Sequence, residues 1–287
     1  MKVLITGAGG QVGRMLLETR PADVEVNALA HGDLDITDAG AVRERILRDL
    51  PDLILNAAAY TAVDKAESEP EAARAINTEG PRHLAAAARD TGARLIHLST
   101  DFVFDGKACA PYTPDAPTNP LSVYGKTKEE GEQAVLTTLA SHAVIVRTAW
   151  VYAAQGTNFL HTMLRVMRSR GEARVVADQV GTPTSARPLA EVLWQIAARR
   201  EFHGIHHWTD AGVASWYDFA VAIAEEGAQL GILPSTVSVT PIATEEYPTP
   251  ARRPSYSVLA RTLTSVDSTP QHWRRRLREV MRELPHA

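Results

Sequence analysis

The sequence has little cysteine and no long hydrophobic run. Cys109 is the one cysteine among 287 residues, which excludes an intrachain disulfide and is typical of a protein from a reducing compartment. No apolar stretch approaches the roughly 20 residues of a membrane-spanning helix. The first residues, Met1–Gly10, lack the hydrophobic region and cleavage site of a signal peptide. We therefore expect a cytoplasmic protein with no membrane partner.

The chain also lacks an excess of positive charge. Its formal net charge is −4, with 30 Lys and Arg against 34 Asp and Glu. This balance argues against nucleic acid as a partner, because phosphate backbones are bound by concentrated basic surfaces. The basic run Arg274–Arg276 is therefore interpreted as a solvated helix face. A few local cations would still be enough to hold a small anionic ligand.

The first half of the chain alternates short apolar runs with longer helical stretches. The predicted strands are Lys2–Thr6, Val24–Leu29, Leu53–Asn56, Arg94–Ser99 and Ala143–Arg147. The predicted helices between them are Gln11–Thr19, Ala39–Leu50, Glu71–Asp90 and Val123–Leu139. Strict alternation of this kind predicts an α/β fold, a Rossmann-type doubly wound parallel sheet buried by helices on both faces.

After about residue 150 the regular alternation ends. The predicted elements are helices at Asn158–Ser169, Pro188–Arg199, Trp216–Leu230 and His272–Leu284, and a strand at Arg174–Ala177. The proline-rich stretch Pro234–Pro254 is predicted to be an ordered loop or short edge strands. We expect a dinucleotide-binding domain over residues 1–150 and a smaller, mostly substrate-binding C-terminal lobe over residues 151–287. A segment near residues 174–208 is expected to return to the first domain.

A glycine-rich segment joins the first predicted strand to the first predicted helix. Gly7, Gly10 and Gly13 keep the spacing G-x-x-G-x-x-G, a variant of the dinucleotide fingerprint. Such glycines permit a tight turn, close approach of the backbone to a pyrophosphate, and close packing of the helix. A glycine-rich turn without a ligand is the alternative, and the position directly after the first strand favours cofactor binding.

The second predicted strand ends without an acidic residue. At Ala30 and His31 the sequence lacks the carboxylate that usually binds the ribose hydroxyls of NAD. A 2′-phosphate is not repelled there, and His31 or Arg14 can lie near it. The cofactor prediction is therefore NADPH, with NADH left open. Asp35 and Ile36 are predicted to flank the adenine.

Tyr124 and Lys128 stand four residues apart at the start of a predicted helix, so that both project from one face. An ammonium beside a phenol favours the phenolate, and Lys128 is predicted to lower the pKa of Tyr124. The tyrosine would then exchange a proton with a carbonyl oxygen, while the lysine reaches the nicotinamide ribose. Thr100, after the fourth predicted strand, can hydrogen-bond the same oxygen. The alternative to a catalytic pair is a chance spacing of Tyr124 and Lys128, and the glycine loop elsewhere in the sequence argues against it.

Several longer strings of the sequence are informative together: Asn56–Pro70, Ser99–Gly106, Tyr124–Lys128, Arg147–Tyr152, Asn158–Phe159, Asp178–Thr184 and Tyr247–Pro254. They resemble one family, that of the dTDP-4-dehydrorhamnose reductases among the extended short-chain dehydrogenases. The similarity runs from Met1 to about Leu263, and Phe102 stands where the family usually has tyrosine.

The resemblance implies reduction of the C4 ketone of dTDP-4-dehydro-L-rhamnose to dTDP-L-rhamnose. It makes Tyr124 the proton donor, Lys128 its partner and Thr100 the residue that orients the ketone. The cofactor-binding residues predicted from motifs and resemblance together are Gly7, Gly10, Gln11, Val12, Gly13, Ala30, Asp35, Ile36, Ala59, Tyr60, Thr61, Tyr124 and Lys128. The predicted substrate-binding residues are Thr100, Asp101, Trp150 and Arg253. For Arg253, as for Arg252, the alternative is a solvated surface arginine.

Other functions stay open at this point. A related ketoreductase or synthase acting on a nucleotide deoxysugar of antibiotic biosynthesis would share the catalytic residues. A non-catalytic regulatory subunit, like the beta subunit of methionine adenosyltransferase, resembles the same family, but the retained Thr100, Tyr124 and Lys128 argue against it.

No metal site is predicted. His203, His206 and His207 belong to a segment interpreted as a buried strand, where neighbouring side chains face opposite ways. Some members of the family bind magnesium through glutamates at a dimer interface, one of them early in the first helix. Met15 stands in that region, which leaves a magnesium-bridged dimer unsupported. A monomer and a homodimer are both compatible with the sequence.

Overall fold

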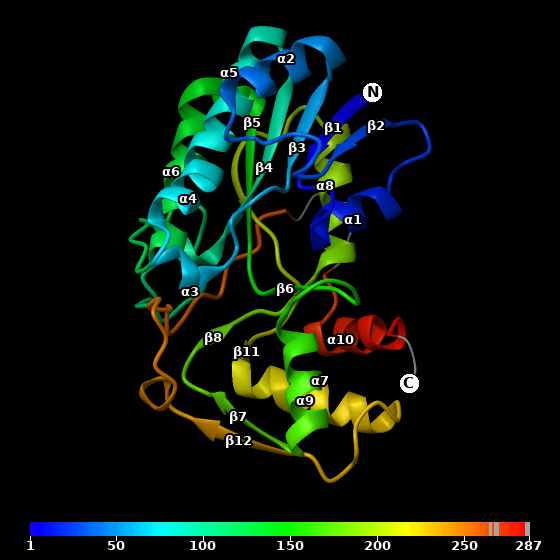
Figure 1. Ribbon diagram of the computed structural model, residues 1–287, viewed down its shortest axis with the longest axis vertical. Coiled ribbons are helices and arrows are strands. Elements are labelled where there is room, and N and C mark those ends of the chain that lie inside the picture. The colour runs from blue at the N-terminus through cyan, green and yellow to red at the C-terminus, as the bar shows by residue number, and fades with distance from the viewer. Residues whose placement is uncertain (264–265, 267–269, 285–287) are drawn as a thin grey trace.

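The computed structural model describes residues 1–263, 266 and 270–284. Its largest feature is a sheet of six parallel strands in the order β10-β5-β4-β3-β1-β2 (Figure 1). In chain order these are β1 (Lys2–Thr6), β2 (Glu25–Leu29), β3 (Leu53–Asn56), β4 (Arg94–Thr100), β5 (Ala143–Thr148) and β10 (Gly204–His207). The predicted Rossmann-type parallel sheet is confirmed, and its strand order changes direction between β1 and β3.

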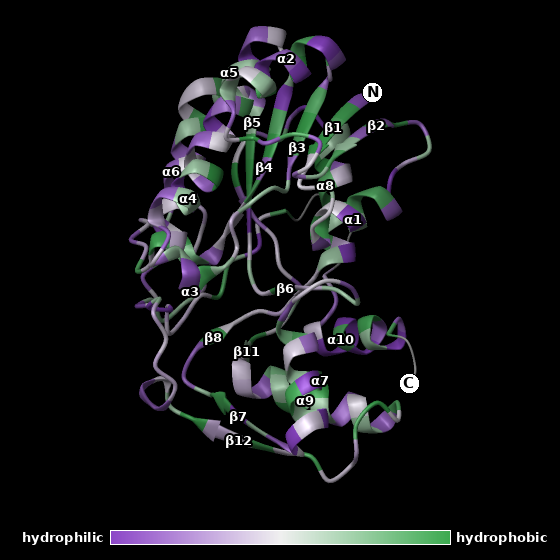
Figure 2. Ribbon diagram, viewed as in Figure 1, coloured by the Kyte–Doolittle hydropathy of each residue, from purple (hydrophilic) through white to green (hydrophobic). Residues whose placement is uncertain are grey.

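Helices cover both faces of this sheet. One face is covered by α1 (Gln11–Glu18) and α8 (Ala186–Ala198), the other by α2 (Ala39–Asp49), α5 (Gly80–Thr91) and α6 (Val123–Leu139). Because alternate residues of a strand point to opposite faces, Val3 and Ile5 pack under α1 and α8, whereas Leu4 packs under α2 and α5. Figure 2 shows hydrophobic residues along β1 and β3, as expected for strands buried on both sides.

The C-terminal lobe is built from three helices and short strand pairs. The helices are α7 (Phe159–Arg170), α9 (Trp216–Gln229) and α10 (Trp273–Arg282). The pairs are β7 (Glu172–Val176) with β12 (Ser238–Ile242), β8 (Val180–Gly181) with β11 (Ala214–Ser215), and β6 (Val151–Tyr152) with β9 (Thr184–Ser185). The lobe has its own core, which includes Leu164, Phe219 and Trp273. After the first lobe elements the chain returns to the sheet through α8 and β10, whereas β7 stays in the lobe.

The predicted helix Glu71–Asp90 is interrupted. The structure has α3 (Val63–Ala66), α4 (Pro70–Arg74) and a wide π-type turn, Ala75–Glu79, before α5 begins. Pro81 has no N–H with which to continue the helical hydrogen bonds, and this allows the turn to widen. The wide turn carries the buried side chain of Asn77.

The histidine segment is also less buried than predicted. β10 is an edge strand that pairs with β5 alone, and Gly204, Ile205 and His206 are half-buried. A strand with one neighbour leaves part of its surface accessible.

Among the described residues, no helix is both long enough and apolar enough to cross a membrane.

Candidate active site

Four polar residues, among them the predicted Thr100, end neighbouring strands at the carboxyl edge of the central sheet. Thr6 ends β1, Asn56 ends β3, Thr100 ends β4 and Thr148 ends β5. Because these strands are parallel, their ends lie along one edge, which faces the C-terminal lobe (Figure 1). Open α/β sheets bind ligands at this edge, where the strand order changes direction.

The glycine loop has the backbone shape that a diphosphate requires. Gly7 has a φ of +73°, and a Cβ on it would lie 2.5 Å from the backbone nitrogen of Ala58. A Cβ on Gly13 would lie 2.3 Å from the Gly7 carbonyl oxygen. Gly10 precedes α1 and has no side chain to cap it. The first N–H groups of α1 can therefore donate to phosphate oxygens.

Gln11 and Val12 follow directly in α1. The Gln11 Oε1 accepts a hydrogen bond from Asn158 Nδ2 at 2.8 Å, which joins the glycine loop to the start of α7 in the lobe. Val12 packs against the core under α1 and α8. These two predicted cofactor-binding residues therefore lie where sheet and lobe meet.

The carboxylates after β2 are already engaged by the chain itself. Asp33 accepts the backbone N–H of Ala30 at 2.9 Å. Asp35 accepts the N–H and the hydroxyl of Thr37 at 2.9 and 2.8 Å, and these bonds lower the pKa of Asp35. Ile36 is buried in the core against Gly80, so any contact with a cofactor would be made by its backbone.

Ala59, Tyr60 and Thr61 form the segment after β3, with Thr61 exposed at its end. The Tyr60 N–H donates to Asn77 Oδ1 at 2.8 Å, and Asn77 Nδ2 donates back to the Tyr60 carbonyl at 3.1 Å. The π-type turn that interrupts the predicted helix thus supports the segment predicted to follow the cofactor.

Tyr124 and Thr100 are brought together by α6 and β4. The Thr100 side chain lies close enough to the Tyr124 phenol to act on its pKa, and the Thr100 hydroxyl donates to Asp101 Oδ1 at 3.1 Å. The ring of Tyr124 packs edge-on against Phe102, with 5.7 Å between centroids. α6 approaches this closely because residue 125 is glycine: a Cβ on Gly125 would lie 2.2 Å from the Phe102 carbonyl oxygen.

The prediction that Lys128 lowers the pKa of Tyr124 is wrong for this structure. The pKa of Tyr124 is raised to about 12, because burial disfavours the phenolate and Asp101 repels it, while the Thr100 side chain acts in the opposite direction. Lys128 Nζ donates instead to the Leu98 carbonyl at 2.7 Å. The four-residue spacing places both side chains on one helix face, but it does not determine which way the ammonium turns.

The sequence analysis did not single out His97, which lies beside Lys128. His97 lies buried in the middle of β4, with its Nε2 3.3 Å from Lys128 Nζ. Its Nδ1 lies 2.9 Å from Asn56 Nδ2. Burial and the nearby Lys128 lower the pKa of His97 well below its ordinary value. The available signal was a histidine inside the apolar run Arg94–Ser99.

Three buried polar atoms at the carboxyl ends of β4 and β5 have no hydrogen-bond partner among the described residues: Ser99 Oγ, Asp101 Oδ2 and Thr148 Oγ1. An unpaired buried polar atom costs about 1–3 kcal/mol, so several of them at one edge mark a place where ligand groups are expected to bind. Burial also raises the pKa of Asp101 to about 7. Ser99 and Thr148 had not been singled out from the sequence.

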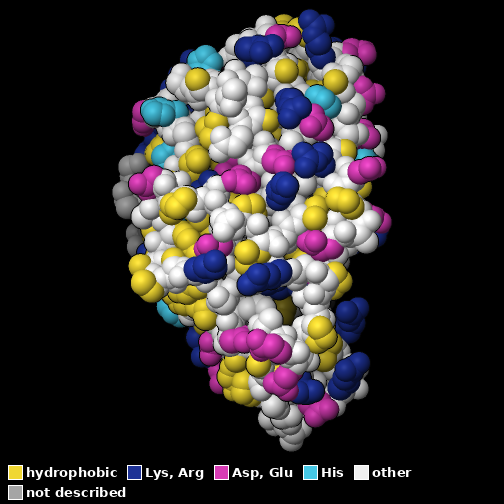
Figure 3. All heavy atoms as spheres, turned by 90° about the vertical axis from the view of Figure 1, so that its left-hand side faces the viewer, with side chains coloured by type: hydrophobic (Ala, Val, Ile, Leu, Met, Phe, Trp, Pro, Cys, Tyr) yellow, Lys and Arg dark blue, Asp and Glu magenta, His cyan; other side chains and the backbone are white. Residues whose placement is uncertain are grey.

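A cleft of about 850 Å³ lies between the sheet edge and the lobe. Its lining includes Thr61 on the sheet side and Phe159 and Trp216 on the lobe side. Trp150, predicted to line the sugar pocket, lies behind Trp216, with the two rings stacked at 3.4 Å and 3°. Trp150 also has a φ of +48°, a strained value for a tryptophan. In Figure 3 the surface is hollowed where sheet and lobe meet, with basic and acidic side chains on the rim.

Arg253 lies in the wall of this cleft, but its guanidinium is occupied. Both of its terminal nitrogens donate to the Asp64 carboxylate, at 2.9 and 2.7 Å, and this hydrogen bonding lowers the pKa of Asp64. Arg253 also donates to Thr249 at 2.6 Å. Arg252 is exposed and does not line the cleft.

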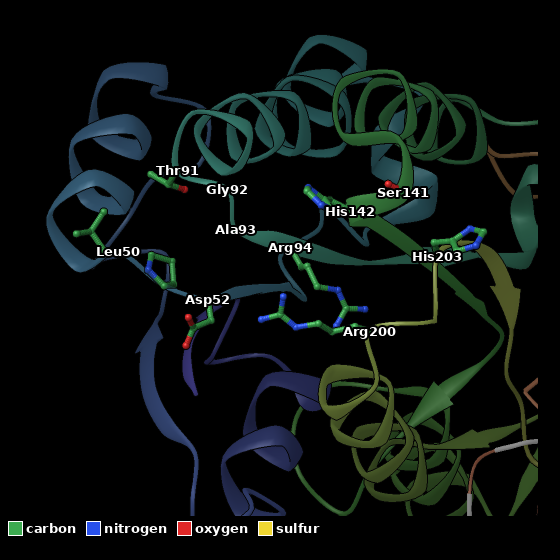
Figure 4. Close-up of a pocket in the computed structure, with 11 residues that line it drawn as sticks. Leu50, Asp52, Thr91, Gly92, Ala93, Arg94, Ser141, His142, Arg200 and His203 are labelled. Atoms are coloured by element: carbon green, nitrogen blue, oxygen red, sulfur yellow. The ribbon is translucent and has the colours of Figure 1, made fainter.

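A second cavity, of about 420 Å³, lies at the opposite edge of the sheet, where β4 begins (Figure 4). Arg94 and Arg200 lie side by side in it, near Asp52. The Arg94 guanidinium donates to the carbonyls of Ala197 and Phe202, both at 3.2 Å, and so holds the end of α8. The residues around this cavity support the sheet and lie outside the predicted site.

The three histidines of β10 and its approach do not converge. His207 Nδ1 lies 3.0 Å from the Tyr112 carbonyl, whereas His206 Nε2 lies 3.0 Å from the carbonyl of His203. Within the described ranges, no group of three or more His, Cys, Asp or Glu side chains is arranged to hold a metal ion.

The fold and the arrangement at the carboxyl edge define the class: an NAD(P)-dependent oxidoreductase with a Rossmann-type sheet, of the extended short-chain dehydrogenase type. The family model for the RmlD substrate binding domain matches residues 1–285. The chain belongs to this family.

Several relatives cover nearly the whole chain. The chain is 41% identical to the spore coat polysaccharide biosynthesis protein SpsK of Bacillus subtilis, over 100% of this chain and 99% of the relative. It is 42% identical to a dTDP-4-dehydrorhamnose reductase of Aggregatibacter actinomycetemcomitans, with 97% and 98% covered. It is also 42% identical to a probable dTDP-4,6-dihydroxy-2-methyloxan-3-one 4-ketoreductase of Streptomyces antibioticus, with 99% and 96% covered.

Two solved structures are similar over 98% of this chain and 99% of their own. One is a dTDP-4-dehydrorhamnose reductase from Clostridium acetobutylicum, with 45% identity and a TM-score of 0.91. The other, from Bacillus anthracis, is 34% identical, also has a TM-score of 0.91, and was solved in complex with NADP.

Proposed function

We propose that this protein reduces the C4 ketone of dTDP-4-dehydro-L-rhamnose to dTDP-L-rhamnose, with NADPH as reductant. The observation that carries the proposal is the contact of Tyr124 with Thr100 at the carboxyl edge of the sheet, with Lys128 on the same face of α6. The relatives named dTDP-4-dehydrorhamnose reductase support this choice of substrate.

The glycine loop and the edge of the sheet fit a nicotinamide dinucleotide. Gly10 and the start of α1 would hold the pyrophosphate, and Ala59–Thr61 would follow the cofactor towards the nicotinamide. Lys128 would reach the nicotinamide ribose. When bound, the reduced nicotinamide supplies the hydride.

Tyr124 and Thr100 handle the proton at the ketone oxygen. With a pKa of about 12, Tyr124 is protonated at neutral pH and can act as the proton donor. Thr100 orients the C4 oxygen, so that both hydroxyls stabilise negative charge as it develops there. The unpaired oxygen of Asp101 is available for a sugar hydroxyl.

The lobe provides the rest of the substrate site. Trp216, supported from behind by Trp150, offers an aromatic face in the cleft. Arg253 is the cation for the diphosphate, and binding there would require its bidentate pairing with Asp64 to open or to be shared.

The preference for NADPH is supported by the surroundings of Ala30. Asp33 and Asp35 come after the end of β2, and the chain orients both through bonds to Ala30 and Thr37. Arg14 is exposed beside the glycine loop, with its Nε donating to the Gly9 carbonyl at 3.1 Å. A basic group near the loop and no carboxylate at the end of β2 favour a 2′-phosphate.

Replacing Tyr124 by phenylalanine tests the assignment. Tyr124→Phe is expected to lower kcat by at least about a hundredfold, because it removes the proton donor, while NADPH affinity stays within about twofold. NADPH oxidation is followed with dTDP-4-dehydrorhamnose made in situ. Tyr112→Phe, which changes a tyrosine outside the site, is the matched control. Unchanged turnover in Tyr124→Phe would remove Tyr124 from the mechanism, and no turnover by the wild type would remove the rhamnose assignment.

A second candidate is a ketoreductase of another dTDP-deoxysugar. The 42% identity to the probable 4-ketoreductase of Streptomyces antibioticus favours it, since the same residues would carry the chemistry. Parallel assays with dTDP-4-dehydrorhamnose and with a dTDP-linked 4-keto deoxysugar lacking the 2-hydroxyl separate the two. A kcat/KM at least tenfold higher for the second substrate would favour this candidate.

A further inference from the structure

A chain of buried hydrogen bonds runs from the end of β1 to Lys128. Thr6 Oγ1 donates to Asn56 Oδ1 at 2.7 Å, and Asn56 Nδ2 lies 2.9 Å from His97 Nδ1. On the other side of the ring, His97 Nε2 lies 3.3 Å from Lys128 Nζ. Thr6 pairs with Asn56 and Asn56 with His97 in the register of β1, β3 and β4, so the sheet itself fixes this chain. All four side chains are at least nine-tenths buried.

The orientation of the Asn56 amide is determined by its neighbours. Asn56 Oδ1 accepts the backbone N–H of Ala58 at 3.1 Å as well as the Thr6 hydroxyl. A backbone N–H can only donate, so the atom facing Ala58 must be the oxygen. The atom facing His97 is therefore the NH₂ group, which also can only donate.

The Asn56 amide in turn determines the tautomer of His97. Because Asn56 Nδ2 donates to Nδ1, that nitrogen carries no proton, and a neutral imidazole then carries its proton on Nε2. The Nε2–H points at Lys128 Nζ. An ammonium has no lone pair with which to accept this bond, whereas a neutral amine accepts it and still donates to the Leu98 carbonyl.

If Lys128 is an ammonium, the hydrogen bonds from Thr6 to Lys128 cannot all be made, whichever ring nitrogen of His97 carries the proton. If the proton of His97 is on Nδ1, this N–H faces the NH₂ group of Asn56, and both groups are donors. If the Asn56 amide also flips, its NH₂ faces the Ala58 N–H. A buried donor that faces another donor costs more than a lost hydrogen bond.

We propose that His97, held in one tautomer by Asn56, is a positioning residue that makes Lys128 a titratable amine in the cofactor-free enzyme rather than a permanent cation. Only the catalytic consequence of this inference rests on the proposed function: a lysine that changes charge near neutral pH can gain or lose a proton as Tyr124 gives up its own during reduction. The titration itself is a property of the free protein.

The charged group nearest to Lys128 favours its ammonium form, and so opposes the proposed loss of a proton, but it is itself paired with a cation. On α6, Glu132 lies one turn further along and favours the ammonium. Its carboxylate is paired with Arg147 of β5. Tyr124 and Asp101 lie at the Thr100 end. Burial is the larger influence, and it lowers the pKa of Lys128 to about 8.

Lysine NMR tests the proposal without any substrate. The chain has five lysines, Lys2, Lys65, Lys107, Lys126 and Lys128, so a sample labelled with ¹³C at lysine Cε gives a simple spectrum. Lys128→Met assigns the Lys128 signal by its loss. We expect that signal to titrate at least about 1.5 pH units below the other four. Titration of Lys128 together with the other four would overturn the proposal.

Two variants distinguish a role of the tautomer from simple burial. His97→Gln offers the ammonium an acceptor oxygen and is expected to raise the Lys128 midpoint by at least about one pH unit. Asn56→Asp keeps the acceptor for Thr6 and Ala58, stabilises the Nδ1–H tautomer and is expected to shift the midpoint the same way. His206→Gln on the edge strand β10 is the control. If neither variant moves the Lys128 midpoint, burial alone sets it and the role of His97 is refuted.

Nitrogen NMR and kinetics complete the test. With ¹⁵N-labelled histidine, the His97 ring, identified by its loss in His97→Gln, is expected to be the Nε2–H tautomer, and an Nδ1–H tautomer would contradict the proposal. In turnover assays, His97→Gln is expected to move the alkaline limb of the pH profile of kcat/KM upward by the same interval as the midpoint, and an unmoved limb would contradict a role in the reaction. If the wild type does not turn over dTDP-4-dehydrorhamnose but Lys128 titrates as expected, only the proposed function is refuted. If the enzyme is active but Lys128 titrates with the other lysines, only this inference is refuted.

Discussion

Two buried basic side chains meet at α6: Lys128 belongs to this helix, and Arg147 of β5 pairs with Glu132, one helical turn after Lys128. Their surroundings differ. Arg147 donates to both oxygens of Glu132, at 2.9 and 2.6 Å, and both side chains are almost fully inaccessible. Lys128, equally buried, has a backbone carbonyl and a histidine as neighbours and, among the described residues, no carboxylate within ion-pair distance. Arg147 cannot lose its proton, whereas Lys128 can.

The difference separates a structural charge from one that we propose to be functional. A bidentate arginine–carboxylate pair is satisfied inside the protein and holds β5 to α6. An unpaired buried lysine costs stability, and proteins keep such groups at sites where chemistry requires them. The unpaired atoms of Ser99, Asp101 and Thr148 lie at the same edge of the sheet as Lys128, which extends the contrast to the whole site.

The largest effect is expected on breaking the paired cation. Glu132→Gln leaves the Arg147 guanidinium buried without a counter-charge and is expected to lower the free energy of unfolding by about 3–5 kcal/mol. Urea unfolding at neutral pH measures it. Glu130→Gln, which removes a more exposed pair with Arg74, is the control, with a loss below about 1 kcal/mol. Equal losses in the two variants would contradict the assigned difference.

Removing the unpaired cation is expected to have the opposite sign. Burial lowers the pKa of Lys128 from 10.5 to about 8 in the folded protein. The unfolded chain binds the proton more tightly, so the cost is present below pH 8 and is lost as pH rises towards 10.5. Lys128→Met is therefore expected to raise the free energy of unfolding by about 2 kcal/mol at pH 7, with a smaller gain at pH 10.

Denaturant unfolding at the two pH values measures this gain. Lys126→Met, the neighbouring exposed lysine, should change stability by less than about 0.5 kcal/mol at both. A destabilised Lys128→Met at pH 7 would show that Lys128 is part of the structural framework.

The smallest effect is expected at the unpaired hydroxyls. Thr148→Val replaces a buried hydroxyl without a partner by a methyl group of similar shape, and is expected to raise the free energy of unfolding by about 1 kcal/mol, because the cost of burying the unpaired hydroxyl is removed. Thr78→Val removes a hydroxyl that donates to the Thr127 carbonyl at 2.9 Å, and should cost about 1 kcal/mol. Thermal unfolding compares them, and a loss of stability in Thr148→Val would assign its hydroxyl a structural partner.

Most of the sheet was predictable because its strands are short, apolar and flanked by clear helices. β1, β3 and α6 have the predicted bounds. The break at Ala75–Glu79 was not predicted, since it depends on the buried side chain of Asn77 bonding the backbone of Tyr60, 17 residues earlier in the chain. The partial exposure of β10 was missed for a related reason, because an edge position is decided by strand order rather than by composition.

The sequence indicated where the candidate site residues lie, but not their electrostatics. Motif spacing fixes the helix face of Tyr124, the strand end that carries Thr100 and the place of the glycine loop, whereas the roles of these residues stay predictions. The direction of the Lys128 ammonium was not predicted, because it depends on His97 and Leu98 of a strand about thirty residues earlier. Trp216 was missed as the partner of Trp150, because their stacking joins two distant segments of the chain.

The two glycines of α6 limit how this enzyme can be redesigned. A Cβ on Gly125 would meet the Phe102 carbonyl at 2.2 Å, and one on Gly131 would meet the Asn77 carbonyl at 2.1 Å. Any larger side chain at either position pushes away the helix that carries Tyr124 and Lys128. Laboratory evolution towards other substrates should therefore randomise the cleft wall around Phe159 and Trp216 and keep α6 unchanged.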